Sequence, residues 1–160
     1  MHQTKINEPI CALSSSKSGA SVSKTNFVCL KSYVDSGAAR SACPKDFAAQ
    51  FETEPTEASR NGSGFRTATG KLVPNMGKRV VMGETGDGRT TGMSYVVADI
   101  AVALDSVSQI CDNGAQVVFT KYGGHILSDT GDRVEFERTG DTYTRSVYVP
   151  LDQNFQRPRQ

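Results

Sequence analysis

The sequence has no tryptophan and only two histidines, four cysteines and six leucines among its 160 residues. It also lacks an excess of either charge, because 18 Lys and Arg stand against 17 Asp and Glu and give a formal net charge of +1. That balance argues against a direct nucleic-acid partner bound through electrostatics. No apolar run approaches the roughly 20 residues of a membrane span, and the N-terminus has no apolar signal core. We therefore expect an intracellular, cytoplasmic protein with no membrane partner.

The scarcity of cysteine and histidine restricts the possible chemistry. The cysteines lie far apart, with no C-x-x-C spacing, at Cys11, Cys29, Cys43 and Cys111. Neither a zinc site nor a disulfide framework is indicated, so we expect reduced thiols, no metal and no cofactor. A Ser-His or Cys-His nucleophile is also disfavoured, because one of the two histidines is His2 in a polar N-terminal segment.

The amino-acid composition favours strands over helices, since the sequence has 15 Val and 14 Thr but only 6 Leu. A length of 160 residues fits one domain, or one domain with an appendage. Apolar and β-branched runs bounded by Gly-containing turns predict the strands of a mainly β fold. These strands are Phe27–Val34, Phe65–Ala68, Leu72–Pro74, Lys78–Met82, Met93–Val97, Gln116–Phe119, His125–Leu127, Val134–Phe136 and Tyr143–Val149.

Two segments have features of short helices. Pro44 suits the first turn of a helix over Lys45–Phe51. The clearest helix begins near Leu104, where apolar residues recur at helical spacing and Ser106 opens a capping-box pattern. Asn113-Gly114 then provides a left-handed stop.

The most informative motif is Asp35-Ser36-Gly37, which follows the apolar strand Phe27–Val34 and precedes Ala38. Aspartic peptidases need two carboxylates that share one proton, so that one activates water while the other protonates or polarises the scissile carbonyl. A hydroxyl after the Asp can lock two such loops together, and a glycine lets backbone N–H groups approach the carboxylate. The alternative is that Asp-Ser-Gly is an ordinary turn.

A second tripeptide, Asp129-Thr130-Gly131, lies among polar and charged neighbours. We expect it to form a hairpin turn between His125–Leu127 and Val134–Phe136. If Asp35 is catalytic and Asp129 is not, the second carboxylate must come from another chain. The active species would then be a homodimer with its site on the two-fold axis.

Three blocks of the sequence resemble the protease region of copia-type retrotransposon polyproteins. The first is Val34–Ala38, similar to that family's apolar-Asp-Ser-Gly-Ala motif, and the second is Ala68-Thr69-Gly70 with Val73-Pro74, similar to its flap hairpin. The third runs from Leu104 to Phe119 and resembles the family's leucine-serine-valine helix and closing strand. Residues His125–Val149 are similar to the start of the pre-integrase segment that follows the protease.

The resemblance implies a retropepsin-like closed β domain with one short helix, followed by a C-terminal β-hairpin extension. It divides the chain into a flexible Ser-rich arm (1–26), a protease domain (27–120), the β extension (121–152) and a polar tail (153–160). The implied function is that of an aspartic endopeptidase, a hydrolase that processes a peptide or polyprotein substrate as a homodimer.

The resemblance also implies the roles of single residues. Asp35 would be the catalytic carboxylate, Ser36 the loop-locking hydroxyl and Gly37 the glycine of close approach. The expected substrate-binding residues are Ala38 beside the loop and Ala68, Thr69 and Gly70 at the flap.

One departure concerns the element Leu104-Asp105-Ser106, where many retropepsins have an apolar residue in place of Asp105. A charge packed beneath the active-site loop could disturb Asp35. The alternative functions are a catalytically inactive retropepsin-like dimerisation or binding module, and a purely structural β domain in which both tripeptides are turns.

Overall fold

The computed structural model describes residues 26–152. Strands account for 49% of these residues and helices for 9%, so the mainly β class is confirmed. The expected tail and, except for Asn26, the expected N-terminal arm lie outside the described residues. None of the helices in the described part of the chain is long and apolar enough to cross a membrane.

Within residues 26–152, ten strands form one mixed sheet and two more form a separate hairpin. The strands of the sheet are β1 (Phe27–Asp35), β2 (Ala42–Cys43), β3 (Thr53–Glu54), β6 (Lys78–Glu84), β7 (Thr90–Val97), β8 (Leu104–Ser106), β9 (Gln116–Phe119), β10 (Gly123–Leu127), β11 (Arg133–Thr139) and β12 (Thr142–Pro150). The hairpin consists of β4 (Gly64–Arg66) and β5 (Leu72–Pro74), and the helices are α1 (Glu57–Arg60) and α2 (Val107–Asp112).

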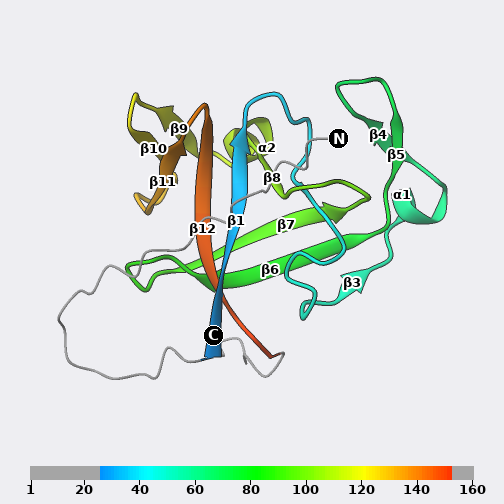
Figure 1. Ribbon diagram of the computed structural model, residues 1–160, viewed down its shortest axis with the longest axis horizontal. Coiled ribbons are helices and arrows are strands. Elements are labelled where there is room, and N and C mark those ends of the chain that lie inside the picture. Colours follow the sequence, from blue (N-terminus) through cyan, green and yellow to red (C-terminus); the bar gives the residue numbers. More distant parts are fainter. Residues whose placement is uncertain (1–25, 153–160) are drawn as a thin grey trace, which may run out of the picture.

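Strand β1 lies in the middle of the sheet, whose order is β3-β6-β7-β2-β8-β1-β12-β11-β10-β9. It pairs in parallel with β8 and antiparallel with β12, from Phe27 opposite Pro150 to Tyr33 opposite Thr144. A further pairing, Tyr148 with Glu84, joins β12 to β6 and closes this part of the sheet on itself (Figure 1). The strands on both sides of the expected boundary at residue 120 therefore share one sheet.

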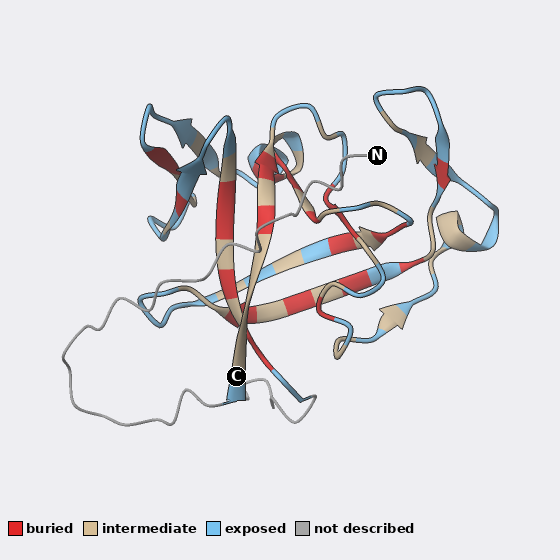
Figure 2. Ribbon diagram, viewed as in Figure 1, coloured by how far each residue is buried: buried red, intermediate tan, exposed pale blue. Residues whose placement is uncertain are grey.

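The core lies between the strands of this closed part. Residues of β6, β7 and β12 alternate between buried and more accessible positions, as the period of two along a strand requires (Figure 2). The buried apolar cluster consists of Cys43, Ala48, Val81, Tyr95, Val97, Ala103, Val147 and Val149. Because two of these residues belong to β12, the C-terminal strand contributes to the same core as β6 and β7.

Helix α2 confirms the prediction of a helix that ends at Asn113, with Ser106 as N-cap and Gly114 at φ +88°. Leu104, which was expected to belong to this helix, lies in β8 instead. The expected count of one helix is wrong, because α1 forms as well. Thr56 caps α1 in a capping box with Ser59.

The predicted helix over Lys45–Phe51 is wrong. The segment forms turns in which Phe47 N donates to Pro44 O and Phe51 N donates to Ala48 O, with Ala48 at φ +51°. The buried guanidinium of Arg79 donates to the carbonyls of Lys45 and Phe47. Arg79 therefore binds backbone acceptors that a continuous helix would use internally.

The described cysteines differ in state. Cys43 is a buried free thiol and Cys111 is an exposed free thiol. Cys29 is disulfide-bonded, so the expectation of reduced thiols throughout the chain fails at this residue.

Candidate functional site

Asp35 is the last residue of β1, and its carboxylate accepts a backbone hydrogen bond from the loop that follows. Gly37 N donates to Asp35 Oδ1 at 2.8 Å. A Cβ added to Gly37 would lie 3.3 Å from the same oxygen, tighter than most real Cβ contacts. Gly37 thus permits the close approach of backbone and carboxylate. Asp35 is half-buried, so its carboxylate is fixed in direction but accessible to solvent.

The loop after Asp35 is fastened to the junction of β8 and α2. Ser106 Oγ donates to Ala38 O at 2.7 Å, and Ser106 N donates to Ser41 Oγ at 2.9 Å. Ser41 N in turn donates to Gln109 Oε1. Ser106 therefore has two functions, since its hydroxyl both caps α2 and holds the Asp35 loop.

Ser36 is exposed, and within the described residues its hydroxyl has no hydrogen-bond partner. The loop thus presents a hydroxyl directly after the carboxylate, available to a second molecule. Ala38 is half-buried, and its carbonyl is the group that Ser106 binds.

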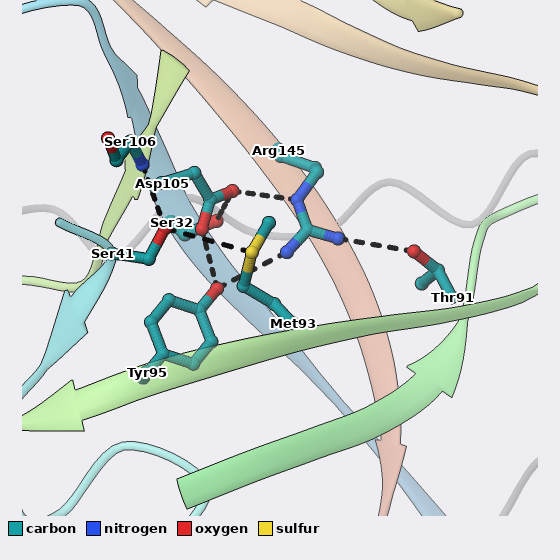
Figure 3. A network of polar contacts seen from close by, with 8 residues as sticks. All are labelled: Ser32, Ser41, Thr91, Met93, Tyr95, Asp105, Ser106 and Arg145. Carbon is teal, nitrogen blue, oxygen red and sulfur yellow. Dashed lines mark hydrogen bonds and ion pairs between the residues drawn. The ribbon is translucent and has the colours of Figure 1, made fainter. Parts of the chain in front are cut away.

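A buried polar network lies beneath this loop (Figure 3). Asp105 is fully buried, and in the parallel pairing of β1 and β8 it lies opposite Val34, next to Asp35. Its carboxylate accepts hydrogen bonds from Ser32 Oγ at 2.6 Å, Tyr95 Oη at 2.6 Å and Arg145 Nε at 2.7 Å. Arg145 is itself 2% exposed.

The protonation states of this network follow from burial and charge. Burial and, after it, the Asp105 charge raise the pKa of Tyr95, so its hydroxyl stays protonated and donates. Burial alone would lower the pKa of Arg145, but the charges and hydrogen bonds of Asp105 and Tyr95 together outweigh burial, so the pKa lies above its usual value. Asp105 and Arg145 thus form a buried, hydrogen-bonded salt bridge.

The charge that the sequence predicts beside the Asp35 loop is present, because Asp105 is buried in the strand next to Asp35. Arg145 neutralises it, however, and two hydroxyls bind its remaining lone pairs. The hydrogen bonds of Asp105 therefore join β8 to β1, β7 and β12 next to the end of the strand that carries Asp35.

The sequence did not predict the partners of Asp105 or of the Asp35 loop, which are Ser32, Ser41, Tyr95, Gln109 and Arg145. The strand pattern indicates that Arg145 is buried. In the predicted strand Tyr143–Val149, Arg145 lies on the same face as Val147 and Val149, which are both core residues. A charged side chain in an inward-facing position requires a buried partner of opposite charge. Asp105, the acidic residue expected beneath the loop, is that partner.

The expected flap forms a hairpin. Thr67 N donates to Lys71 O at 2.9 Å and Gly70 N donates to Thr67 O at 2.8 Å, which places Ala68, Thr69 and Gly70 at the tip. Gly70 has φ +82°, a conformation that glycine adopts without strain. Ala68, Thr69 and Gly70 are all exposed, and the β4–β5 hairpin projects away from the sheet beside α1 (Figure 1).

A cleft of about 550 Å³, here called the hairpin cleft, lies between this hairpin and the sheet. Its walls come from the base of the hairpin, from the neighbouring ends of β6 and β7, and from Arg40, Ser41 and Gln109 behind the Asp35 loop. Neither Asp35-Ser36-Gly37 nor the tip residues Ala68–Gly70 line it. Thr56 and Ala58 at α1 complete the lining, and Ser41 and Gln109 bring the cleft next to the segment that follows Asp35.

The second tripeptide lies elsewhere. Asp129 is exposed in the turn between β10 and β11, where Gly131 N donates to Ser128 O at 3.1 Å and Gly131 has φ +91°. The predicted hairpin at this position is confirmed. Among residues 26–152, no three His, Cys, Asp or Glu side chains lie together as the ligands of a metal ion would.

Comparison of the chain with protein-family models, with curated proteins and with solved structures finds no match. The chemistry of the site therefore rests on its geometry. That geometry consists of one accessible carboxylate in a loop bonded to Ser106, a neighbouring hydroxyl with no partner among residues 26–152, and a cleft that adjoins the loop.

Proposed function

We propose that this protein is an aspartic endopeptidase that acts as a homodimer, with Asp35 of each chain supplying one of two catalytic carboxylates. The observation that carries the proposal is the Asp35 loop. Its carboxylate accepts the Gly37 N–H, and the loop is fixed to Ser106 above the buried Asp105–Arg145 pair. The resemblance of Val34–Ala38, of the β4–β5 hairpin and of Leu104–Phe119 to copia-type retrotransposon proteases supports the same function.

The requirement for two chains follows from the carboxylates near the loop. Asp105 is adjacent in the sheet, but its oxygens are bound by Arg145, Tyr95 and Ser32. Asp129 lies in an exposed turn of another hairpin. Of these three described carboxylates only Asp35 is usable, so a second copy of the chain would supply the other. The free hydroxyl of Ser36 would then bind the facing loop.

The reaction divides the work between the two Asp35 side chains. The ionised one takes a proton from a water molecule, whose oxygen attacks the carbonyl carbon of the scissile peptide. The protonated one donates its proton to the carbonyl oxygen. The tetrahedral species collapses when its nitrogen is protonated, and the C–N bond breaks to give a carboxylate and an amine. The overall reaction consumes one water molecule for each peptide bond, and it calls for no metal or cofactor.

The substrate we propose is a peptide or polyprotein segment that passes beneath the β4–β5 hairpin, which acts as the flap. Ala38 on one side and Ala68–Gly70 on the other would contact it. A catalytically inactive dimerisation module with the same fold is the function that replaces this proposal if the following test fails.

The test is cleavage of a mixed peptide library, read by mass spectrometry between about pH 3.5 and pH 7. Asp35→Asn keeps the side-chain volume and removes the base, so it should abolish cleavage while circular dichroism stays unchanged. Asp129→Asn is the matched control and should retain the parental rate. If the Asp35→Asn protein cleaves as fast as its parent, the enzyme proposal is wrong.

A further inference from the structure

We infer that the hairpin cleft selects peptide segments that carry an acidic side chain. The inference rests on the proposed function for its biological meaning, but it concerns binding and can be tested without catalysis. It follows from the charges and from the hydrogen-bonding groups of the residues that line the cleft.

The charged residues of the cleft wall are all cationic. Arg40 and Lys78 line it, and the lining includes no Asp or Glu. Neither cation forms an ion pair within the described residues, where the pairs involve Lys31, Arg89, Arg133 and Arg145. Glu54 is paired with Lys78 in the β3–β6 register, yet it is outside the lining and forms no ion pair with it. The cleft thus has two cations available to a ligand.

The uncharged amides of the wall also present donors. Asn75 Oδ1 accepts the hydrogen bond of Gly77 N at 2.8 Å, and Gln109 Oε1 accepts that of Ser41 N. Because a backbone N–H can only donate, the oxygen of each amide is fixed toward the protein. The two NH₂ groups have no partner within the described residues. They are donors, and a carboxylate is the side-chain group that offers only acceptors.

Donors and cations together define the ligand chemistry. A carboxylate can accept from an amide NH₂ and a guanidinium or ammonium group at the same time, and hydrogen bonds to charged groups are the stronger kind. An amide side chain such as Gln forms fewer of these hydrogen bonds, because its oxygen accepts but its NH₂ group is itself a donor. Arg40 and Lys78 are exposed, so each should raise the affinity for an acidic peptide by a factor of about two to five. Added salt should reduce this contribution.

The experiment uses the full-length Asp35→Asn protein, immobilised, so that peptides bind without being cut. A degenerate peptide pool is passed over it, and the retained fraction is sequenced by mass spectrometry. We expect Asp and Glu to be enriched about threefold or more over the input at low salt, with the enrichment lost in the Arg40→Gln/Lys78→Gln double variant. The control is Lys45→Gln/Lys121→Gln, which removes the same charge from exposed positions outside the cleft and should keep the enrichment.

The outcomes separate this inference from the proposed function. Retention of peptides without acidic enrichment, no retention at all, or equal enrichment by the cleft and control variants would overturn the inference. Acidic enrichment together with an absence of cleavage by the parental protein would overturn the peptidase and leave the binding preference standing. Cleavage by the parental protein, together with no acidic enrichment among the retained peptides, would overturn the inference and leave the peptidase standing.

Discussion

Replacing Arg145 by methionine should destabilise the protein more than any surface charge change. The side chains of Arg145 and Asp105 are 3% and 0% exposed, and the substitution leaves the Asp105 carboxylate buried without its counter-ion. Breaking a buried pair by removing one partner costs about 3–5 kcal/mol. For a chain of this size that loss lowers the melting temperature by about 6–20 °C. Urea unfolding followed by circular dichroism measures the free energy directly.

Two further variants make the result interpretable. Arg133→Met removes an exposed ion pair, whose side chains are 53% and 66% accessible, and should cost at most about 1 kcal/mol. Combining Arg145→Met with Asp105→Leu replaces both charges by apolar groups and should recover part of the lost stability, since the buried hydroxyls of Ser32 and Tyr95 lose their acceptor. A loss below about 1 kcal/mol in the Arg145→Met protein would refute the claim that this buried pair stabilises the fold.

The other predictions concern the hairpin, the thiols and the assembly. Gly70→Val places a branched residue at φ +82° and should reduce peptide cleavage several-fold, while costing only about 1–2 kcal/mol in urea unfolding; parental activity would remove the flap role. Burial raises the pKa of Cys43 from 9.0 to about 11, so iodoacetamide at pH 8 should label exposed Cys111 first, as peptide mapping would show. Because the folded state holds the Cys43 proton more tightly, stability should also fall as the pH rises from 9 to 11. Sedimentation should show a dimer in active samples, and a purely monomeric active sample would contradict the two-chain site.

Local patterns in the sequence predicted much of the fold. The hairpins β6–β7 and β10–β11 follow from strand composition and glycine turns, and the N-cap Ser106 follows from its capping pattern. These features depend on residues that are close in the chain. The same holds for the placement of Asp35 at the end of a strand.

Features that depend on distant residues were not predictable in this way. Nothing local indicates that β12 pairs with β1 across more than 100 residues, or that β12 also meets β6. The segment Lys45–Phe51 has helical composition, but Arg79, more than 25 residues later, binds its carbonyls and leaves it in turns. Arg145 belongs to the site for the same reason, since its partner Asp105 lies on another strand.

The shared active site can be tested most directly by mixing two proteins. Parental protein at fixed concentration is equilibrated with increasing amounts of Asp35→Asn protein, and the initial rate of peptide cleavage is measured. If each site needs Asp35 from two chains, mixed dimers are inactive and an equal amount of variant should lower the rate to about half, with a ninefold excess lowering it to about one tenth. A rate that stays constant at every ratio, in a mixture shown to exchange subunits, would contradict the two-chain aspartic peptidase.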